Sequence, residues 1–448
     1  MKTNSSVENT QLTLSLLREI LNDEAVHDIR VRLWDGTCFP DATPRKATLV
    51  LKHPGSLRSM LLPGTEVRLA EAYLFDDFDI EGTVEEIFCL EDLLTNRSNS
   101  VLKKLRAAGK LLKLPAGPKH QNARRGPANL KGKLHSIKRD REAVTYHYDV
   151  SNDFYALWLD RNMVYSCAYF QTPEVSLDQA QEDKLNYICR KLRLKPGQRL
   201  LDIGCGWGGL ALHAARHYGV DVTGITLSQP QVELANQRIE SAGVADRCRV
   251  LLRDYRELGE PGAYDALVSV GMFEHVGEQL LASYFAKAWE LLKPGGVFLN
   301  HGISDRHGAK KTENRTSFGD NYVFPDGELV PISTTLAAAE AAGFEVCDVE
   351  NLREHYALTL RHWVRRLEEH HAQALQYVDE PTYRVWRLYM SGAAYRFKVG
   401  RVNVYQSLLV RQDTKGHSLQ PLTREDWYST ESLKEKGVSY DGISGHQS

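Results

Sequence analysis

The 448-residue sequence has no long hydrophobic run and few cysteines. No stretch approaches the roughly 18 to 20 consecutive apolar residues of a membrane-spanning helix, and the opening MKTNSSVENTQ lacks the apolar core of a secretion signal. The seven cysteines are odd in number and form no C-x-x-C pair, so neither a metal site nor a redox pair is predicted. These absences favour a cytoplasmic protein whose contact with any membrane is peripheral.

Acidic residues are scarce in one segment of the chain. The formal net charge is only −2, yet residues 97–141 carry 14 lysines and arginines against one acid, Asp140, and the remainder carries 42 basic and 57 acidic residues. This segment opens with VLKKLRAAGKLLKL, in which leucines alternate with lysines, and continues as PAGPKHQNARRGPANLKGK. The pattern predicts an amphipathic basic helix followed by a linker.

Four regions follow from the changes in pattern along the chain. Helical and short strand-like runs (LTLSLLREIL, VRLWDG, ATLVLKH) predict a small α+β domain at the N-terminus. A longer region after the basic segment alternates hydrophobic strands with helical stretches. The predicted boundaries are 1–96 for the α+β domain, 97–142 for the basic helix and linker, 143–415 for the main domain and 416–448 for a C-terminal tail.

The main domain is predicted to be a doubly wound, Rossmann-like α/β fold. Strand-like runs recur at intervals that hold a helix, as in VDVTGITL, RVLLRD, DALVSV, GVFLNHGI, FEVCDVE and VYQSLLV. Strands separated by helical segments such as QPQVELANQRIESAG are typical of a largely parallel sheet.

The segment LLDIGCGWGGLALHAA predicts a ligand site. Asp202 ends a hydrophobic strand, and Gly204, Gly206 and Gly209 open a helix, where glycines let a ligand approach the backbone closely. A dinucleotide would also suit such a loop, but its ribose needs an acid at the end of the second strand. That strand ends instead in Thr226 and Leu227, and an acid directly before the glycines suits the ammonium of an amino-acid-bearing cofactor.

Residues that follow the second and third strands of the main domain extend this prediction. Asp254 and Tyr255 follow the third strand and could meet the edge and face of an adenine ring, although Asp is common at strand ends. Gln231 begins the helix after Thr226 and offers an uncharged partner for ribose hydroxyls. A solvated glutamine at a helix start is the alternative.

Several motifs in order resemble the cyclopropane-fatty-acyl-phospholipid synthase family, which includes the mycolic acid cyclopropane synthases. They are YHYDVSNDFYALWLD, YSCAYF, LDIGCGWGG, VTGITLSQPQ, VSVGMFEHVG and FPDGEL, within about residues 143–410. WDGT and LAEAYLFDDFDIEGT resemble the leading domain of longer bacterial members. The resemblance implies a class I methyltransferase that moves a methyl group from S-adenosylmethionine to a cis double bond of an unsaturated phospholipid acyl chain. The resulting carbocation closes to a cyclopropane ring when the new methyl loses a proton.

The resemblance also implies a bound bicarbonate as the base for ring closure. The family positions that hold bicarbonate match Cys167, Glu274, His301, Ile303 and Tyr356, and those that touch the cofactor include Tyr165 and Ser166. Taken singly, such residues are more often core packing or helix caps, but their joint occurrence favours the site. Cys167 is not expected to be a nucleophile, because its neighbours supply no base or cation. A fatty-acyl methyltransferase that gives a methylene-branched (10-methylene type) product is the alternative reading.

Aromatic residues gather before the glycine loop. They are Tyr146, Tyr148, Phe154, Tyr155, Trp158, Tyr165, Tyr169 and Phe170. We expect them to form a water-excluding wall whose ring faces can meet a cation. A packed aromatic lid without that role is the alternative.

The expected partner of the basic segment is an anionic phospholipid surface. Each basic residue near such a surface contributes about 1 kcal/mol to binding, which would hold the protein peripherally on the inner leaflet of a bacterial membrane. A plain linker is the alternative, and no nucleic acid partner is expected because the segment has no interleaved aromatic residues. The N-terminal domain is expected to serve lipid interaction, and the resemblance implies a homodimer.

Overall fold

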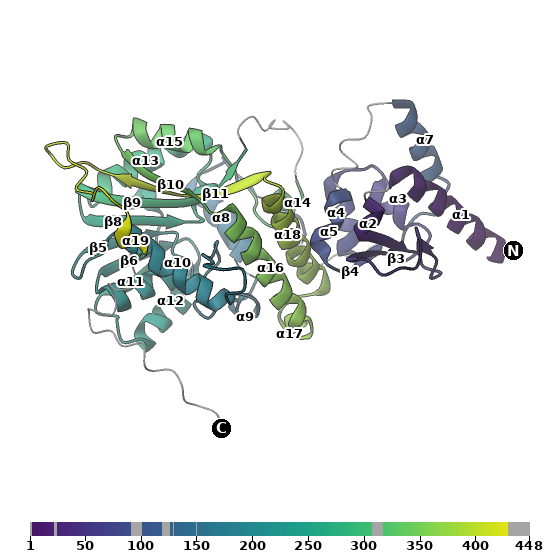
Figure 1. Ribbon diagram of the computed structural model, residues 1–448, viewed down its shortest axis with the longest axis horizontal. Helices are drawn as coiled ribbons and strands as arrows, with labels where there is room; N and C mark the ends of the chain where they lie inside the picture. The colour runs from purple at the N-terminus through teal and green to yellow at the C-terminus, as the bar shows by residue number, and fades with distance from the viewer. Residues whose placement is uncertain are drawn as a thin grey trace, which may run out of the picture.

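The structure is a computed structural model that describes residues 2–21, 25–90, 101–118, 126–128, 130–148, 150–306 and 317–428. Its main domain is built on a seven-stranded sheet with the order β10-β11-β9-β8-β5-β6-β7 (Figure 1). The strands are β5 (Arg199–Ile203), β6 (Asp221–Thr226), β7 (Cys248–Leu252), β8 (Tyr264–Val270), β9 (Leu292–Asp305), β10 (Glu345–Asn351) and β11 (Val402–Val410). Strands β5 to β9 pair in parallel, whereas β10 and β11 pair antiparallel. The predicted largely parallel sheet is confirmed.

Helices cover both faces of this sheet, which explains why its strands are nearly continuous apolar runs. One face packs against α10 (Leu177–Lys191), α11 (Gly209–Tyr218) and α12 (Gln229–Ser241), and the other against α13 (Leu281–Leu291) and α15 (Ile332–Ala341). Three 3₁₀ turns lie in loops of the domain, η1 (Tyr255–Glu257), η2 (Phe273–His275) and η3 (Glu278–Leu280).

A further group of helices continues the main domain toward the N-terminal domain. They are α8 (Ile137–Tyr148), α9 (Asn152–Ala156), α14 (Phe318–Tyr322), α16 (Arg353–Glu369), α17 (His371–Tyr377) and α18 (Glu380–Lys398). Helix α8 crosses the boundary that the sequence placed after residue 142. The last part of the basic segment is therefore a helix of the main domain and not a linker.

The N-terminal domain has a four-stranded sheet with the order β2-β1-β3-β4. Its strands are β1 (Ile29–Arg32), β2 (Cys38–Phe39), β3 (Ala47–Leu51) and β4 (Phe78–Gly82). Its helices are α1 (Lys2–Ile20), α2 (Ala25–Asp28), α3 (Ser56–Leu61), α4 (Glu66–Leu74) and α5 (Val84–Ile87), with α7 (Val101–Leu111) packed against α1 and α3. The α+β organisation agrees with the sequence pattern.

The basic helix is confirmed as a helix, but part of its apolar side faces the protein. Leu111 and Leu114 are buried in the hydrophobic core that the N-terminal domain shares with the main domain, and Lys110 pairs with Glu19 of α1. Leu112, by contrast, is exposed. The side chains at 101–105, and residues 97–100, 119–125 and 129, lie outside the described residues. Nowhere in the described part of the chain is there a helix long and apolar enough to cross a membrane.

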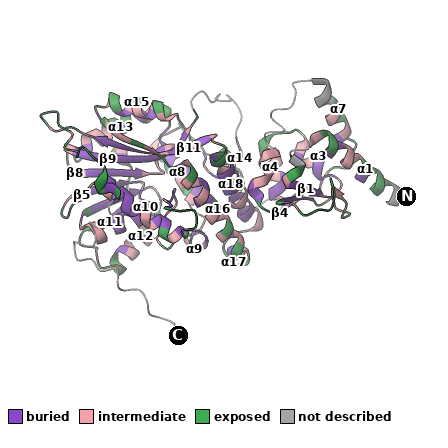
Figure 2. Ribbon diagram, viewed as in Figure 1, coloured by how far each residue is buried: buried purple, intermediate pink, exposed green. Residues whose placement is uncertain are grey.

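The two domains share one hydrophobic core, which Figure 2 shows as buried ribbon running from one domain into the other. Helix α18 packs against both α4 and α5. At the other end of the chain, residues 416–428 do not form a free tail, because α19 (Glu425–Tyr428) buries Trp427 against α10. Residues 429–448 lie outside the described residues.

Candidate active site

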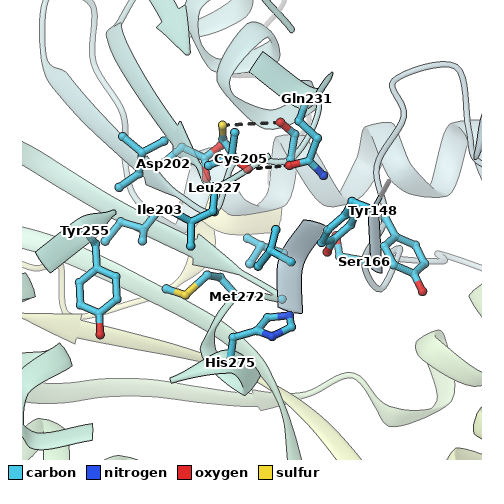
Figure 3. Close-up of a pocket in the computed structure, with 18 of the residues that line it drawn as sticks. Tyr148, Ser166, Asp202, Ile203, Cys205, Leu227, Gln231, Tyr255, Met272 and His275 are labelled. Atoms are coloured by element: carbon cyan, nitrogen blue, oxygen red, sulfur yellow. Dashed lines mark hydrogen bonds between the residues drawn. The ribbon is translucent and has the colours of Figure 1, made fainter. Parts of the chain in front are cut away.

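A cavity of about 130 Å³ lies at the carboxyl ends of β5, β6, β7 and β8. In open α/β sheets this edge is where ligands bind. Figure 3 shows Ser166, Asp202, Gln231, Tyr255 and Met272 around this cavity. All eleven residues predicted to bind the cofactor line it: Tyr165, Ser166, Asp202, Gly204, Gly206, Gly209, Thr226, Leu227, Gln231, Asp254 and Tyr255.

The glycine loop needs glycine for two reasons. Gly204 has a φ of 78°, and a Cβ atom there would lie 2.5 Å from the Cβ of Met272. Gly208, which the sequence analysis did not select, has a φ of 75° and caps α11. A side chain at Gly204 would therefore be strained and would also collide with the opposite wall of the cavity.

Asp202 and Lys184 are a pair of opposite charges in this cavity. Asp202 is buried, its Oδ2 finds no hydrogen-bond partner among the described residues, and burial raises its pKa to about 7, an effect that Lys184 opposes. Lys184 donates to the Oγ of Ser166 at 3.0 Å, and burial lowers its pKa to about 8. An amino-acid moiety carries an ammonium and a carboxylate, and these two side chains offer one partner for each.

Lys184 was missed by the sequence analysis, although a signal exists. Lys184 and Lys191 fall in helical register with the buried Ala180 and Ile188 on the apolar side of α10. Lysine is almost never fully buried unless it is paired. Lys191 pairs with Asp348 and Glu350, whereas Lys184 faces the cavity.

Two polar side chains, those of Thr226 and Gln231, are hydrogen-bonded to each other at the end of β6. Thr226 donates its hydroxyl to the Oε1 of Gln231 at 2.6 Å, and Ser228 caps the helix by accepting from the Gln231 backbone N–H at 3.4 Å. Gln231 is buried. Its side-chain oxygen accepts from Thr226, so its side-chain NH2 group can donate to a ligand hydroxyl.

Asp254 is engaged more strongly than the sequence suggested. Its carboxylate accepts from the Nε of Arg256 at 2.8 Å, from the Nη2 at 2.6 Å and from the backbone N at 2.9 Å. Arg256 also donates to Asp140 of α8 at 2.8 Å. A carboxylate offers about four lone-pair sites, so Asp254 keeps little capacity for an adenine. Arg256, which the sequence analysis missed, links Asp254 to Asp140 of α8.

The five residues predicted to hold bicarbonate come from separate segments that meet near β8 and β9. The backbone N–H of Ile303 donates to the Oε1 of Glu274 at 2.7 Å. The Oε2 of Glu274 is shielded from solvent and has no hydrogen-bond partner in the described residues, and burial raises the pKa of Glu274 to about 7. Burial also raises the pKa of Tyr356, and the charges of Tyr389, Cys167 and Glu274 act in the same direction.

His301 differs in one respect from the prediction. It lies within β9 and does not follow it, because this strand continues to Asp305. Its Nδ1 lies 3.2 Å from the side-chain amide nitrogen of Gln406, and its Nε2 has no partner among the described residues. Burial lowers its pKa to about 3, so the ring is neutral at physiological pH.

Cys167 is buried and inert as a nucleophile. Its thiol lies 3.3 Å from the Ala168 carbonyl and 3.7 Å from the Leu352 carbonyl, and burial raises its pKa. A thiol kept protonated in this way supplies a weak donor and a small apolar surface.

The aromatic wall exists, with different members from those predicted. Tyr148, Phe154, Tyr155, Trp158 and Tyr165 form one cluster, in which Tyr155 and Trp158 have ring centroids 5.3 Å apart. Trp207, Trp363 and Trp386 complete this cluster. The other three predicted members lie elsewhere: Tyr146 donates to backbone carbonyls, Tyr169 stacks on His355, and Phe170 stacks on His362.

Comparison with known proteins identifies a family and several relatives of this chain. The sequence profile described as mycolic acid cyclopropane synthetase matches residues 135–407. A Pseudomonas putida protein named "Probable fatty acid methyltransferase" is 42% identical over 402 residues, which are 89% of this chain and 96% of that protein. The Escherichia coli cyclopropane-fatty-acyl-phospholipid synthase is 39% identical over 279 residues, 62% of this chain and 70% of that protein.

A solved structure is similar in fold and sequence. The mycolic acid cyclopropane synthase CmaA1, complexed with SAH and CTAB, has a TM-score of 0.57 and 36% identity. The match covers 60% of this chain and 97% of that one.

Proposed function

The chain belongs to the mycolic acid cyclopropane synthetase family and is an S-adenosylmethionine-dependent methyltransferase, and from this premise we propose that it converts the cis double bond of an unsaturated phospholipid acyl chain into a cyclopropane ring. One observation carries the proposal. Glu274 and His301 each present a buried polar atom that has no hydrogen-bond partner among the residues that the structure describes. Buried polar groups normally have partners, so this pair fits a small polar species.

The cavity beside the glycine loop suits S-adenosylmethionine, which supplies an electrophilic methyl group when bound. The unpartnered Oδ2 of Asp202 can accept from an ammonium, and Lys184 can pair with a carboxylate. Gln231 can donate its amide to a ribose hydroxyl. Tyr148, Tyr165 and Trp207 line the same cavity, and their ring faces can stabilise a sulfonium.

Glu274, His301 and the three residues beside them suit bicarbonate, which would supply the base for ring closure. In the observed orientation, Gln406 donates to the Nδ1 of His301, so a neutral ring carries its proton on Nε2. That N–H can donate to an anion, while the Oε2 of Glu274 can accept from a hydroxyl. The donor and acceptor needed for a singly protonated anion are thus both present.

The clustered indoles keep the reacting region dry. The N–H groups of Trp158, Trp363 and Trp386 are buried and find no hydrogen-bond acceptor in the described part of the chain. A carbocation exposed to water would be trapped as an alcohol, so exclusion of water protects the product.

A second product is supported by a specific observation. The Pseudomonas relative, named a probable fatty acid methyltransferase, matches 89% of this chain, whereas the Escherichia coli synthase matches 62%. A fatty-acyl methyltransferase that forms a methylene-branched chain is therefore the other candidate. A 1,2-hydride shift from the methylated carbon to its cationic neighbour, followed by loss of a proton from the new methyl group, would give that product from the same cation.

Product analysis separates the two candidates. The protein is incubated with S-adenosylmethionine and vesicles of oleoyl phospholipid, and the acyl chains are weighed by mass spectrometry before and after catalytic hydrogenation. A product that carries one added CH2 and resists mild hydrogenation supports the ring. A product that takes up hydrogen contradicts the ring and supports the methylene branch.

Activity is expected to rise with pH through about 7. Glu274 must be a carboxylate to accept from a bicarbonate hydroxyl, and its pKa is raised to about 7. His301 stays neutral over this range because its pKa is lowered to about 3. The test is single-turnover rate against pH with a constant bicarbonate concentration. A rate that falls as pH rises from 6 to 8 would contradict the assignment.

Lys184→Met is expected to weaken cofactor binding by about tenfold to a hundredfold, because a hydrogen bond to a charged group contributes about 1.5–3 kcal/mol. Isothermal titration with S-adenosylhomocysteine measures the loss. Lys191→Met is the matched control on the same helix. It leaves Asp348 and Glu350 without their buried cation, so it should lower stability while cofactor affinity stays unchanged. Equal loss of affinity in both variants would remove the specific role of Lys184.

A further inference from the structure

A loop of the main domain connects the cofactor cavity to the residues assigned to bicarbonate. Residues 161–170, which we call the connecting loop, form neither helix nor strand, and most of them are buried. The loop carries Tyr165 and Ser166, which line the cofactor cavity, and then Cys167, which belongs to the proposed bicarbonate site. One short piece of backbone therefore presents side chains to both halves of the proposed reaction.

A buried loop without secondary structure must find partners elsewhere for its backbone N–H and C=O groups. Asp160, directly before the connecting loop, accepts from the backbone N–H groups of Asn162 and Val164, both at 2.8 Å. Arg238 of α12 donates to the Asn162 carbonyl at 3.0 Å. The same carbonyl oxygen would lie 2.7 Å from a Cβ atom on Gly209, so the loop begins in close contact with the start of α11.

The middle of the connecting loop is held to α10 by the side chain of Gln181. Gln181 is fully buried, and its Nε2 donates to the Val164 carbonyl at 3.2 Å and to the Ser166 carbonyl at 2.9 Å. The residues that carry these two carbonyls flank Tyr165 in the chain. Lys184, one helical turn further along α10, donates to the Ser166 hydroxyl at 3.0 Å. Gln181 therefore fixes the backbone that holds Tyr165 and Ser166 at the cofactor cavity.

The end of the connecting loop is held to α16 by the side chain of Thr359. Thr359 is fully buried, and its hydroxyl accepts from the Ala168 backbone N–H at 3.0 Å and donates to the His355 carbonyl at 2.7 Å. Thr359 is three residues after Tyr356 on α16, so the two lie on the same side of the helix. Thr359 therefore ties the backbone next to Cys167 to the helix that carries Tyr356.

We propose that Gln181 and Thr359 are positioning residues that set the separation of the cofactor and the bicarbonate: Gln181 fixes the cofactor half of the connecting loop, and Thr359 fixes the bicarbonate half. The inference rests on the proposed function, because that function assigns bicarbonate to the second site. The methyl group that leaves the cofactor is the one that must later lose a proton to the base. A misplacement of about 1 Å can lower a rate about a hundredfold, so the two sites need a fixed separation.

The test measures two quantities in the full-length protein: calorimetric affinity for S-adenosylhomocysteine, and the bicarbonate concentration that gives half-maximal turnover of oleoyl phospholipid vesicles. Gln181→Met keeps nearly the length of the side chain but donates no hydrogen bond. It should weaken S-adenosylhomocysteine binding about tenfold and change the bicarbonate requirement by less than about twofold. Gln179→Met, at an exposed position of the same helix, is the matched control and should change neither quantity.

Thr359→Val is expected to give the opposite result. Valine keeps the shape of the side chain but lacks the hydroxyl, so the bicarbonate requirement should rise about tenfold, while S-adenosylhomocysteine affinity stays within about twofold. Thr359→Ser keeps the hydroxyl and should restore the wild-type requirement. Thr335→Val is the matched control, because Thr335 is buried on α15 and its hydroxyl also donates to the carbonyl four residues back, that of Pro331. It should change neither quantity.

The outcomes separate this inference from the proposed function. If Gln181→Met and Thr359→Val each altered both quantities equally, or altered neither, the two positioning roles would be overturned and the proposed function would stand. A bicarbonate requirement that rose as much in Thr335→Val as in Thr359→Val would mark a general loss of stability and overturn the role of Thr359. Wild-type turnover that did not depend on bicarbonate would overturn the proposed function and the role of Thr359 with it, whereas a selective effect of Gln181→Met on cofactor affinity would still support the role of Gln181.

Discussion

Glu274→Gln is expected to lower turnover about 1,000-fold, within the range of about 10² to 10⁴ that a positioned acid–base group supplies. The amide keeps the size of the side chain and can still accept from the Ile303 N–H, but it has no carboxylate oxygen for a bicarbonate hydroxyl. Affinity for S-adenosylhomocysteine should stay within about twofold, because Glu274 does not line the cofactor cavity. Single-turnover rates and calorimetric titration measure the two quantities.

Two further variants test whether this result is specific to the proposed site. His301→Ala should lower the rate in the same way, since it removes the unpartnered Nε2 donor. Glu278→Gln changes an exposed glutamate four residues along and should leave the rate unchanged. If Glu274→Gln reduced cofactor affinity as much as rate, Glu274 would belong to the cofactor site and the base-holding role would fail.

Asp202→Asn is expected to weaken S-adenosylmethionine binding by about a hundredfold or more, because truncating one partner of a buried charged pair costs about 2–5 kcal/mol. Asn keeps the shape of the loop but cannot offer a second carboxylate oxygen to an ammonium. Titration calorimetry measures the loss. Asp221→Asn, at the exposed start of β6, is the control and should bind the cofactor normally.

The same variant has a predicted effect on stability without cofactor. Burial raises the pKa of Asp202 to about 7, so between about pH 4 and 7 the folded protein holds a proton that the unfolded chain has released. Stability therefore falls as pH rises through this window. Asp202→Asn lacks this loss and should have a higher Tm than wild type at pH 8. A lower Tm at pH 8 would show that the carboxylate is stabilised by contacts other than the cofactor.

Much of the main domain could be predicted because its signals are local. Each strand of the parallel sheet is a short apolar run, and Asp202 with its glycines occupies the turn after one of them. The ends of parallel strands meet at one edge of the sheet, so Thr226, Leu227 and Asp254 were placed near the same ligand. All three line the cavity.

Contacts that join distant parts of the chain could not be predicted from the sequence. The sequence placed Asp254 against an adenine, but its carboxylate accepts from Arg256, which also donates to the distant Asp140 of α8. The aromatic wall was drawn from neighbours in sequence, whereas the structure takes Trp363 and Trp386 from helices far along the chain.

The sequence by itself determined the α/β class, the glycine loop with its acid, and the residues that could accept, donate or exclude water. The tertiary structure alone decided that Lys184 faces the cavity of Asp202, that Leu111 and Leu114 are buried and not presented to a membrane, and that the two domains enclose an apolar cavity. The reason is physical. Backbone conformation and periodicity are set by near neighbours, whereas burial, pairing of charges and the space left between packed elements depend on which distant segments meet.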